Sequence, residues 1–192
     1  FERRSLDALR QPLEDKVVTI SRVNGTATFP AEVMLVAAMN PYRGSEDGTT
    51  DLARAMRETY GDKLSGPILD RIDLWVEVPH LSYDSLQAAP TTTGETIAAR
   101  TRIKAARAAQ AARLHGRTAS TNAAMTSRDL EETVTLTPDV STVLRQAATQ
   151  LNLSPRSYHR LIKVAQTIAD LDGAATIDTN HLFEALQYRI KV

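Results

Sequence analysis

Two apolar runs limit the fold of this chain more than any other feature. The first is Val33-Met-Leu-Val-Ala-Ala-Met39, which stops at Asn40-Pro41. The second lies in the stretch from Ser65 to Pro79, where it runs from Ile72 to Val78 after a Gly-Pro turn signal and Arg71. Apolar runs that are continuous rather than alternating suit strands buried on both faces, as in the parallel sheet of an α/β protein. Each run carries polar residues at one end, and α/β sheets hold their ligands at strand ends. Asn40 and Arg71 are therefore the first candidate functional residues.

Length and composition narrow the class of protein. The chain has 192 residues, enough for one large or two small domains, and its 23 basic and 23 acidic residues leave no net charge. Because the charges balance, the chain has no overall electrostatic field that would indicate a nucleic acid or a membrane as its partner. The absence of cysteine excludes disulfides and thiolate metal sites. The apolar runs are far shorter than the roughly 18 residues needed to span a bilayer. We expect a cytoplasmic protein with no membrane partner.

The beginning of the chain predicts a helix and a hairpin. Leucines at helical spacing predict a helix over residues 1–15, and short alternating strands follow at 17–21 and 26–29. Asn24-Gly25 between these strands is a strong hairpin signal. The chain starts inside the predicted helix, without an initiator methionine or a signal peptide, so we expect it to be a piece of a longer protein. Residues 41–63 indicate a loop with a short helix at 52–58, and residues 79–93 a polar connection.

The rest of the chain predicts helices. Thr92 and Glu95 form a capping box that opens a long Ala/Arg helix, which reaches about Leu114 and which Gly116 can end. Three amphipathic helices with short connections follow and predict a small bundle, the second of them closed by Gly173. Their predicted caps are Thr137-Pro138, Ser154-Pro155, and Asp178 or Thr179. The predicted fold class is therefore an α/β part followed by an all-α part.

Several short motifs follow one another along the chain. They are Leu9-Arg-Gln-Pro-Leu-Glu-Asp15, Phe29-Pro30, Asn40-Pro41, Ser65-Gly-Pro-Ile-Leu-Asp-Arg-Ile-Asp73, Leu153-Ser-Pro-Arg-Ser-Tyr-His-Arg160, Thr167-Ile-Ala-Asp-Leu171 and Glu184-Ala-Leu-Gln-Tyr-Arg189. In this order and at these separations they resemble the magnesium-chelatase-like AAA+ ATPases of the ComM (YifB) type. The match covers nearly the whole chain, and the ordered set is much more specific than any one motif.

The resemblance implies a fold and a division into domains. Residues 1–80 would be the C-terminal half of an AAA+ α/β core, residues 81–122 a linker with a long connecting helix, and residues 123–192 a helical lid. The Walker A and Walker B segments of the P-loop ATPase module would lie upstream of Phe1. No G-x-x-x-x-G-K-[ST] loop occurs in this sequence. The chain alone is therefore expected to bind no ATP or Mg²⁺ and to be inactive as an ATPase.

The resemblance also implies roles for two residues of the core. Asn40 matches the sensor-1 asparagine, whose amide can orient the attacking water and contact the γ-phosphate. Without the resemblance, a turn that ends a strand is the favoured explanation of Asn-Pro. Arg71 matches the arginine finger, a planar guanidinium that acts in trans on a neighbouring subunit's nucleotide. The alternative for Arg71 is a surface ion pair with Asp70 or Asp73.

In the lid, Arg156 matches the sensor-2 arginine. It lies near a predicted helix N-terminus, an unfavourable position for a cation unless an anion binds there. For Arg160, one turn later, we expect either a solvated side chain or a salt bridge within the lid. In the same family Arg before Thr-Ile-Ala-Asp is usual, whereas this chain has Gln166. This difference places an extra lid contact in doubt but leaves sensor 2 intact.

Contacts to DNA have weaker signals. The hairpin matches one that points into the ring pore in this family, where Lys16 and Arg22 could hold a phosphate backbone. No aromatic residue lies at its tip for base stacking, so a purely structural hairpin stays an equal alternative. The long helix carries a row of cations on one face, for which a solvated face is the first interpretation and DNA contact the second. This row is Arg100, Lys104 and Arg107.

Metal binding has no support in the sequence. The four histidines have no metal-ligand spacing, and the segment Asn40-Pro-Tyr-Arg-Gly44 lacks the cysteines that ComM-type members usually carry there. We therefore assign no metal ligands.

The resemblance implies that the intact protein hydrolyses ATP with Mg²⁺ in a homo-oligomeric ring, a hexamer. It would move DNA, as in branch migration or helicase-like work during natural transformation or recombination. One alternative is a chelatase motor that drives insertion of magnesium into a porphyrin. The other is a non-catalytic interaction module formed by the lid and the hairpin.

Overall fold

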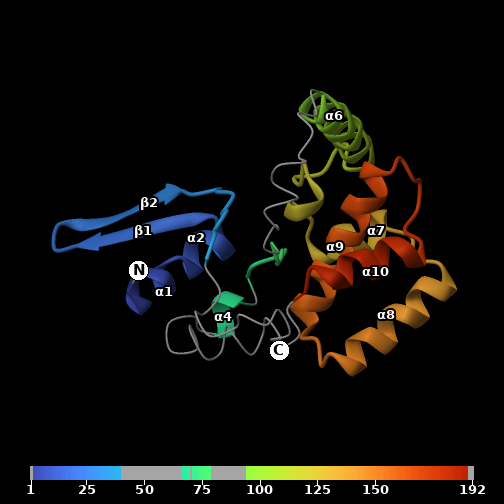
Figure 1. Cartoon of the computed structure of the whole chain (residues 1–192). Coiled ribbons are helices and arrows are strands. Elements are labelled where there is room, and N and C mark those ends of the chain that lie inside the picture. Colours follow the sequence, from blue (N-terminus) through green and yellow to red (C-terminus); the bar gives the residue numbers. More distant parts are fainter. Residues whose placement is uncertain (1, 40–65, 70, 79–93, 190–192) are drawn as a thin grey trace, which may run out of the picture. The chain divides into compact units, whose positions relative to one another are not determined.

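The chain divides into two compact units in a computed structural model that describes residues 2–39, 66–69, 71–78 and 94–189 (Figure 1). One unit comprises Phe1–Ile72 with Ile190–Val192, and the other comprises Asp73–Arg189. Asn40, residues 41–63 and the connection at 79–93 lie outside the described residues, so the predictions made for them are not tested. The proposed domain boundaries at residues 80 and 122 stay predictions.

The first unit begins with two short helices where the sequence predicted one. Helix α1 spans Arg3–Ala8 and helix α2 spans Arg10–Asp15. The helix breaks at Leu9 because Pro12 has no N–H to donate to the carbonyl of Ala8 and its ring crowds that carbonyl. Lys16 then ends α2 in the left-handed conformation, with a φ of 56°.

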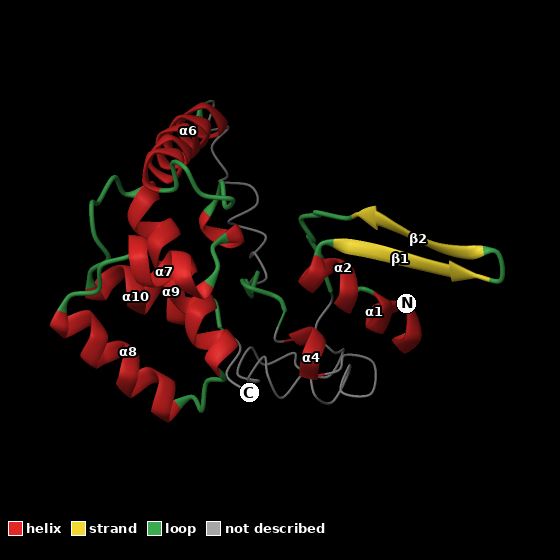
Figure 2. Cartoon of the chain, turned by 180° about the vertical axis from the view of Figure 1, so that it is seen from behind, coloured by secondary structure: helices red, strands yellow, loops and turns green. Residues whose placement is uncertain are grey.

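The predicted hairpin is confirmed, with its turn shifted by one residue. Strand β1 (Val17–Arg22) pairs antiparallel with β2 (Gly25–Pro30), and Arg22 lies opposite Gly25 (Figure 2). The loop is therefore Val23-Asn24, and Gly25 opens β2 with a φ of 142°, which L side chains rarely adopt. Two cross-strand hydroxyl pairs support the register, with oxygens 3.3 Å and 3.1 Å apart. They are Thr19–Thr28 and Ser21–Thr26.

The prediction that the two apolar runs form buried strands is wrong for the described residues. Residues 33–39 and 72–78 are in no strand, and most of their large apolar side chains are exposed, including Val36 at 82% and Val78 at 85%. An apolar run becomes a buried strand only when strands on both edges complete its hydrogen bonds and other elements cover its faces. The only sheet in the described residues is the two-stranded hairpin. Short helix α4 (Gly66–Leu69) precedes the second run and buries Ile68.

The second unit is helical, as the sequence predicted. Its helices are α6 (Glu95–Arg113), the 3₁₀ turn η1 (Asn122–Ala124), α7 (Ser127–Thr133), α8 (Pro138–Gln150), α9 (Pro155–Leu171) and α10 (Thr179–Gln187). Helix α9 is central, since it contacts α6, η1, α7 and α10. Its Leu161 packs in a core with Leu144 of α8, Leu182 of α10 and Ile177, all essentially inaccessible to solvent. Within the described ranges, no helix has the length and apolar character needed to cross a membrane.

The predicted helix caps are confirmed where the structure describes them. The side chains of Thr137, Ser154 and Asp178 each accept a hydrogen bond from a backbone N–H of the first turn that follows. Gly173 has the positive φ expected of a residue that ends a helix. Helix α6 instead starts after Gly94, whose φ of 125° suits glycine, and Thr92 lies outside the described residues. The sequence analysis did not identify α7, although Thr126 and Asp129 form its capping box.

Candidate functional site

The first turn of α9 carries the predicted sensor-2 residue. Ser154 accepts from the N–H of Ser157 at 3.2 Å, and Pro155 occupies the first helical position, where its missing N–H costs nothing. Arg156 comes next and is exposed. The remaining N–H groups and the helix dipole make this end positive, so it favours an anion. The sensor-2 role of Arg156 stays a prediction, and the local geometry suits it.

Two further arginines lie against the beginning of α9. Arg160 forms an ion pair with Asp73, with Nη1 and Oδ1 3.0 Å apart. The prediction of a salt bridge is confirmed, but the partner lies in the segment assigned to the core and not in the lid. Arg189, which follows α10, donates from Nη2 to Oγ of the buried Ser157 at 2.8 Å. In the sequence, Arg189 is recognisable only as the end of a motif. Its position after an amphipathic helix was the signal available, but that signal does not identify the partner.

Arg71 is held inside the first unit by an acidic residue that the sequence analysis did not consider. Its guanidinium forms an ion pair with the carboxylate of Glu14 on α2, and only 11% of its side chain is exposed. Its backbone N–H donates to the carbonyl of Ile68 at 2.9 Å. The suggested pairing with Asp73 is wrong, because Asp73 pairs with Arg160, and Asp70 lies outside the described residues. Arg71 and Arg156 belong to different units.

The two cations proposed for DNA contact on the hairpin differ in availability. Lys16 donates from Nζ to Oε1 of Glu32 at 2.7 Å, and this hydrogen bond and charge lower the pKa of the Glu32 carboxyl. Arg22 ends β1 and is exposed. Since Glu32 already neutralises Lys16, Arg22 is the better candidate for a phosphate contact.

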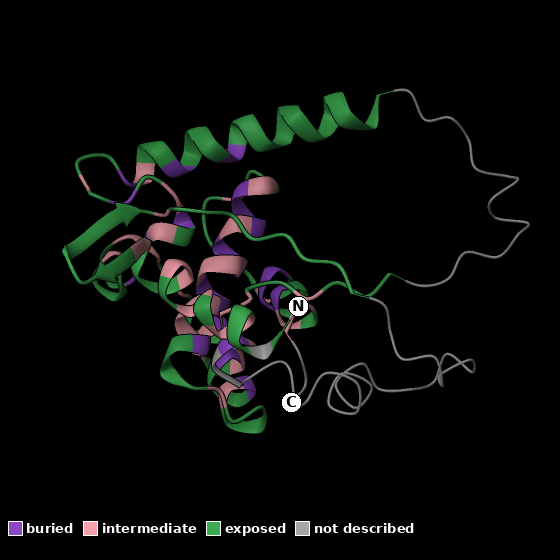
Figure 3. Cartoon of the chain, turned by 90° about the vertical axis from the view of Figure 1, so that its left-hand side faces the viewer, coloured by how far each residue is buried: buried purple, intermediate pink, exposed green. Residues whose placement is uncertain are grey.

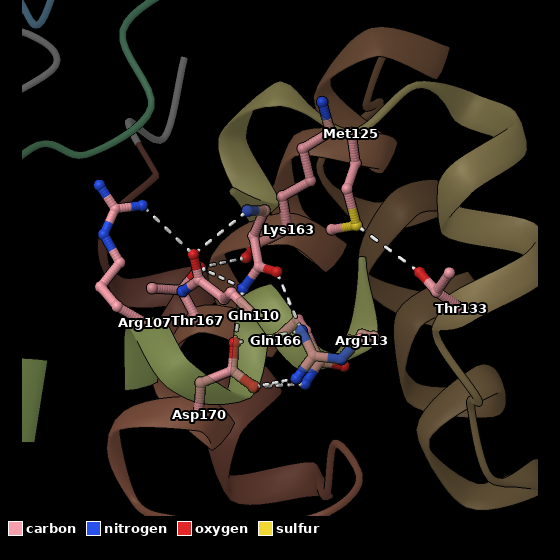
Figure 4. Close-up of polar contacts among 10 residues, drawn as sticks. Arg107, Gln110, Arg113, Met125, Thr133, Lys163, Gln166, Thr167 and Asp170 are labelled. Atoms are coloured by element: carbon pink, nitrogen blue, oxygen red, sulfur yellow. Dashed lines mark hydrogen bonds and ion pairs between the residues drawn. The ribbon is translucent and has the colours of Figure 1, made fainter. Parts of the chain in front are cut away.

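The structure also shows a buried polar cluster around Asp170 of α9, which we call the Asp170 cluster (Figure 4). The Asp170 side chain is completely inaccessible to solvent, and the Arg113 guanidinium donates to both of its carboxylate oxygens. Asn122 donates from Nδ2 to Oδ2 at 2.8 Å, and Gln166 donates from Nε2 to Oδ1 at 3.1 Å. Each oxygen thus accepts two hydrogen bonds. A carboxylate saturated in this way is poorly suited to act as a base, so the cluster is structural.

Neighbouring polar groups extend the Asp170 cluster across three elements. The Oε1 of Gln110, on α6, accepts from the N–H of Asn122 at 3.4 Å and from Nη1 of Arg107 at 3.5 Å. Asn122 also donates to Oγ1 of Thr167 at 3.0 Å. Gln166 was expected as a departure from the family, but its partner, Asp170, was not predicted. Helix α6, the turn η1 and helix α9 are therefore held together by buried hydrogen bonds (Figure 4).

Two of the described histidines have structural contacts through their side chains. The Nδ1 of His181 accepts from the backbone N–H of Asp178 at 3.0 Å and completes the capping box of α10. His159 Nδ1 lies 3.2 Å from Oγ of Ser127. Among residues 2–39, 66–69, 71–78 and 94–189, no three His, Asp or Glu side chains are grouped as a metal site.

Comparison with known proteins covers both units. Residues 1–86 match the family model described as magnesium chelatase, subunit ChlI, and residues 93–189 match the model for the C-terminal part of that subunit. The chain is 44% identical over 198 residues to competence protein ComM of Haemophilus influenzae, an alignment that covers all of this chain and 37% of that protein. It is 38% identical to the uncharacterized protein YifB of Escherichia coli and to that of Salmonella typhimurium, again over 98% of this chain and 37% of theirs. The chain thus spans about 37% of the length of these curated relatives.

Proposed function

The chain belongs to the magnesium-chelatase-like family of the ComM/YifB type, and from that premise we propose that it is part of an ATP-hydrolysing AAA+ motor that acts on DNA. In this proposal the first unit supplies the late part of the AAA+ α/β core, and the helical unit supplies the lid. The exposed apolar runs at 33–39 and 72–78 are surfaces that the rest of this core would cover in the longer protein. The proposed assembly is a hexameric ring of the longer protein.

The observation that carries the proposal is the exposed Arg156 in the first turn of α9. A guanidinium beside a positive helix end is stabilised by a bound anion, and a nucleotide phosphate fits both groups. ATP would supply the phosphoryl group that is transferred to water, with Mg²⁺ bound to its phosphates. We assign Arg156 to phosphate contact and assign no described residue to Mg²⁺. Asn40, as sensor 1, would orient the attacking water.

Arg71 is the proposed arginine finger, and Glu14 would hold it until a neighbouring subunit docks. Transition-state charge on the transferred phosphoryl group would then compete with the Glu14 carboxylate for the guanidinium. Because the ion pair is inside one unit, replacing Arg71 also removes a contact that stabilises the fold. A test of the finger must separate these two effects.

The test uses the longer protein with its ATPase activity as the readout. Arg71→Ala is expected to lower kcat by about 10³-fold with nearly unchanged ATP affinity, and Arg71→Lys to rescue it poorly. The control Glu14→Gln removes the same ion pair but keeps the guanidinium, so it should retain most of the activity. Rings mixed from the Arg71→Ala protein and a Walker A variant should recover activity. Mixed rings that exchange subunits and stay inactive, or an active Arg71→Ala protein, would contradict the proposal.

DNA is the proposed substrate because the similarity to competence protein ComM extends over the whole chain. The family models favour a second candidate, since both carry the description of a magnesium chelatase subunit. ATPase activity of the longer protein that rises with added DNA would support the DNA motor. Activity that ignores DNA but responds to a porphyrin and a partner subunit would support the chelatase motor.

A further inference from the structure

Helix α6 carries a strong local excess of positive charge. Between Glu95 and Arg113 it has one acidic residue, Glu95 in the first turn, and five basic residues. These are Arg100, Arg102, Lys104, Arg107 and Arg113. Since the whole chain has no net charge, this excess is a property of the helix and is not shared by the surface in general.

Two of these cations form ion pairs inside the helical unit. Arg113 pairs with the buried Asp170, and Arg102 donates from Nη2 to Oδ1 of Asp172 at 2.8 Å. Both acidic residues belong to or directly follow α9, so Arg102 and Arg113 define the side of α6 that packs on α9. The fully buried Ala106 and Gln110 lie on this same side.

The other three cations lie on the flank and outer face of α6, outside its buried residues. With about 100° of rotation per residue, Arg107, Arg100 and Lys104 lie about 100°, 120° and 160° from the buried Ala106. All three are exposed, and most of α6 is exposed along its length (Figure 3). Within the described part of the chain no carboxylate pairs with any of them, and Arg107 has only its long contact to Gln110. These residues, which we call the α6 row, span about 10 Å of helix axis.

We propose that the α6 row binds the sugar–phosphate backbone of DNA without reading its bases. This inference rests on the proposed function, and it names a surface by which this chain would hold the DNA. Surface cations are ordinarily solvated or paired with nearby carboxylates. On α6 the carboxylates of α9 pair with the inward cations, so the row stays positive over its full length. Consecutive like charges along a line suit a polyanion, since each neutralised phosphate releases a counterion. The row has no aromatic side chain for stacking. Arginine and lysine can pair with guanine, but most protein–DNA hydrogen bonds from such cations go to phosphates, so we expect binding independent of sequence.

The proposal is tested on the complete 192-residue chain by fluorescence anisotropy with two labelled DNA duplexes of unrelated sequence. In the row variant all three members of the α6 row are replaced by Gln. The control variant removes the same number of positive charges elsewhere by replacing three exposed arginines, Arg4, Arg145 and Arg128, of which Arg128 pairs with Glu132. Thermal unfolding of each variant confirms that it is folded. Phosphatidylserine vesicles serve as a second anionic probe.

We expect the row variant to bind both duplexes at least about tenfold more weakly at 50 mM salt, and the control variant to bind like the wild type. Loss of three phosphate contacts reduces the slope of log affinity against log salt by about 2.7. Between 50 and 200 mM salt, the affinity of the row variant should therefore fall by a factor about 40-fold smaller than that of the wild type. Equal slopes for the row and control variants would overturn the proposal. Binding of the wild type to vesicles but not to duplexes would also overturn it, in favour of a membrane surface.

The outcomes distinguish this proposal from the proposed function. If the chain does not bind DNA while the ATPase of the longer protein is stimulated by DNA, the proposal for the α6 row is wrong and the proposed function is supported. If the row variant loses DNA binding while DNA does not stimulate the ATPase of the longer protein, the proposal for the α6 row is supported and the proposed substrate of the motor is wrong.

Discussion

Replacing Arg113 by Met should destabilise the helical unit strongly. The substitution keeps a long, unbranched side chain with good helix propensity, so the helix itself loses little. It removes the guanidinium from Asp170, whose side chain is fully buried. The carboxylate then keeps only the amide donors of Asn122 and Gln166.

The magnitude follows from the burial of the pair. Removing one partner of a buried ion pair costs about 3–5 kcal/mol because it leaves an uncompensated buried charge. For a folded unit of about 100 residues, each kcal/mol lowers Tm by about 4 °C, which gives a decrease of about 12–20 °C. Arg102→Met is the matched control, since it breaks a pair between the same two elements at the surface. That pair, with Asp172, is about half exposed on both sides, and its loss should cost at most about 1 kcal/mol.

The single tryptophan of the chain reports on this unit. Trp75 lies within Asp73–Arg189, and its backbone N–H donates to the backbone carbonyl of Tyr188 at 2.9 Å. Urea and thermal unfolding followed by tryptophan fluorescence therefore compare Arg113→Met with the control. Adding Asp170→Asn to Arg113→Met should recover part of the loss, with a coupling energy of about 1–3 kcal/mol. If the two Met variants unfold alike and the double variant is additive, the reasoning about a desolvated pair is refuted.

Two further predictions concern local contacts, and a third concerns the missing phosphate loop. Hydrogen bonds from Arg128 and then Arg117 lower the pKa of the Glu132 carboxyl in the folded chain. These contacts therefore stabilise the fold at a pH above the pKa of an unfolded glutamate, about 4.3. Their contribution to stability is lost as the pH falls below that value and the carboxyl is protonated. Acid unfolding curves of the wild type and Glu132→Gln should therefore converge toward pH 3, and a constant difference would exclude the ion pairs as the cause. Ser154→Ala removes the cap of α9 and should cost about 1 kcal/mol by urea unfolding, whereas Ser154→Gly should cost a few tenths, and equal losses would argue against the cap. Calorimetry of the chain with ATP and Mg²⁺ should show no binding in the micromolar range, because the sequence contains no Gly-rich phosphate loop.

Local features were predictable from the sequence because their physics is local. Thr137, Ser154 and Asp178 cap helices through hydrogen bonds to N–H groups three residues away, so a few letters suffice to identify them. The same holds for the hairpin, although Pro12 split the first helix and the turn moved by one residue. Apolar spacing predicted the three helices that the structure shows as α8, α9 and α10, and they were confirmed for the same reason, whereas α7 was not predicted.

The candidate sites depended on contacts that no local pattern contains. Arg71 pairs with Glu14, and Arg113 pairs with Asp170, in each case 57 positions away in the sequence. Both arginines could be identified as cations from the sequence, but their partners could not, because the folded chain decides which carboxylates come near. The same limit made the prediction of buried strands wrong. The run at 33–39 is apolar by composition, but strands and helices elsewhere decide whether it is buried. On α6, five basic residues were visible in the sequence, and only their packing against α9 separated the two paired arginines from the α6 row.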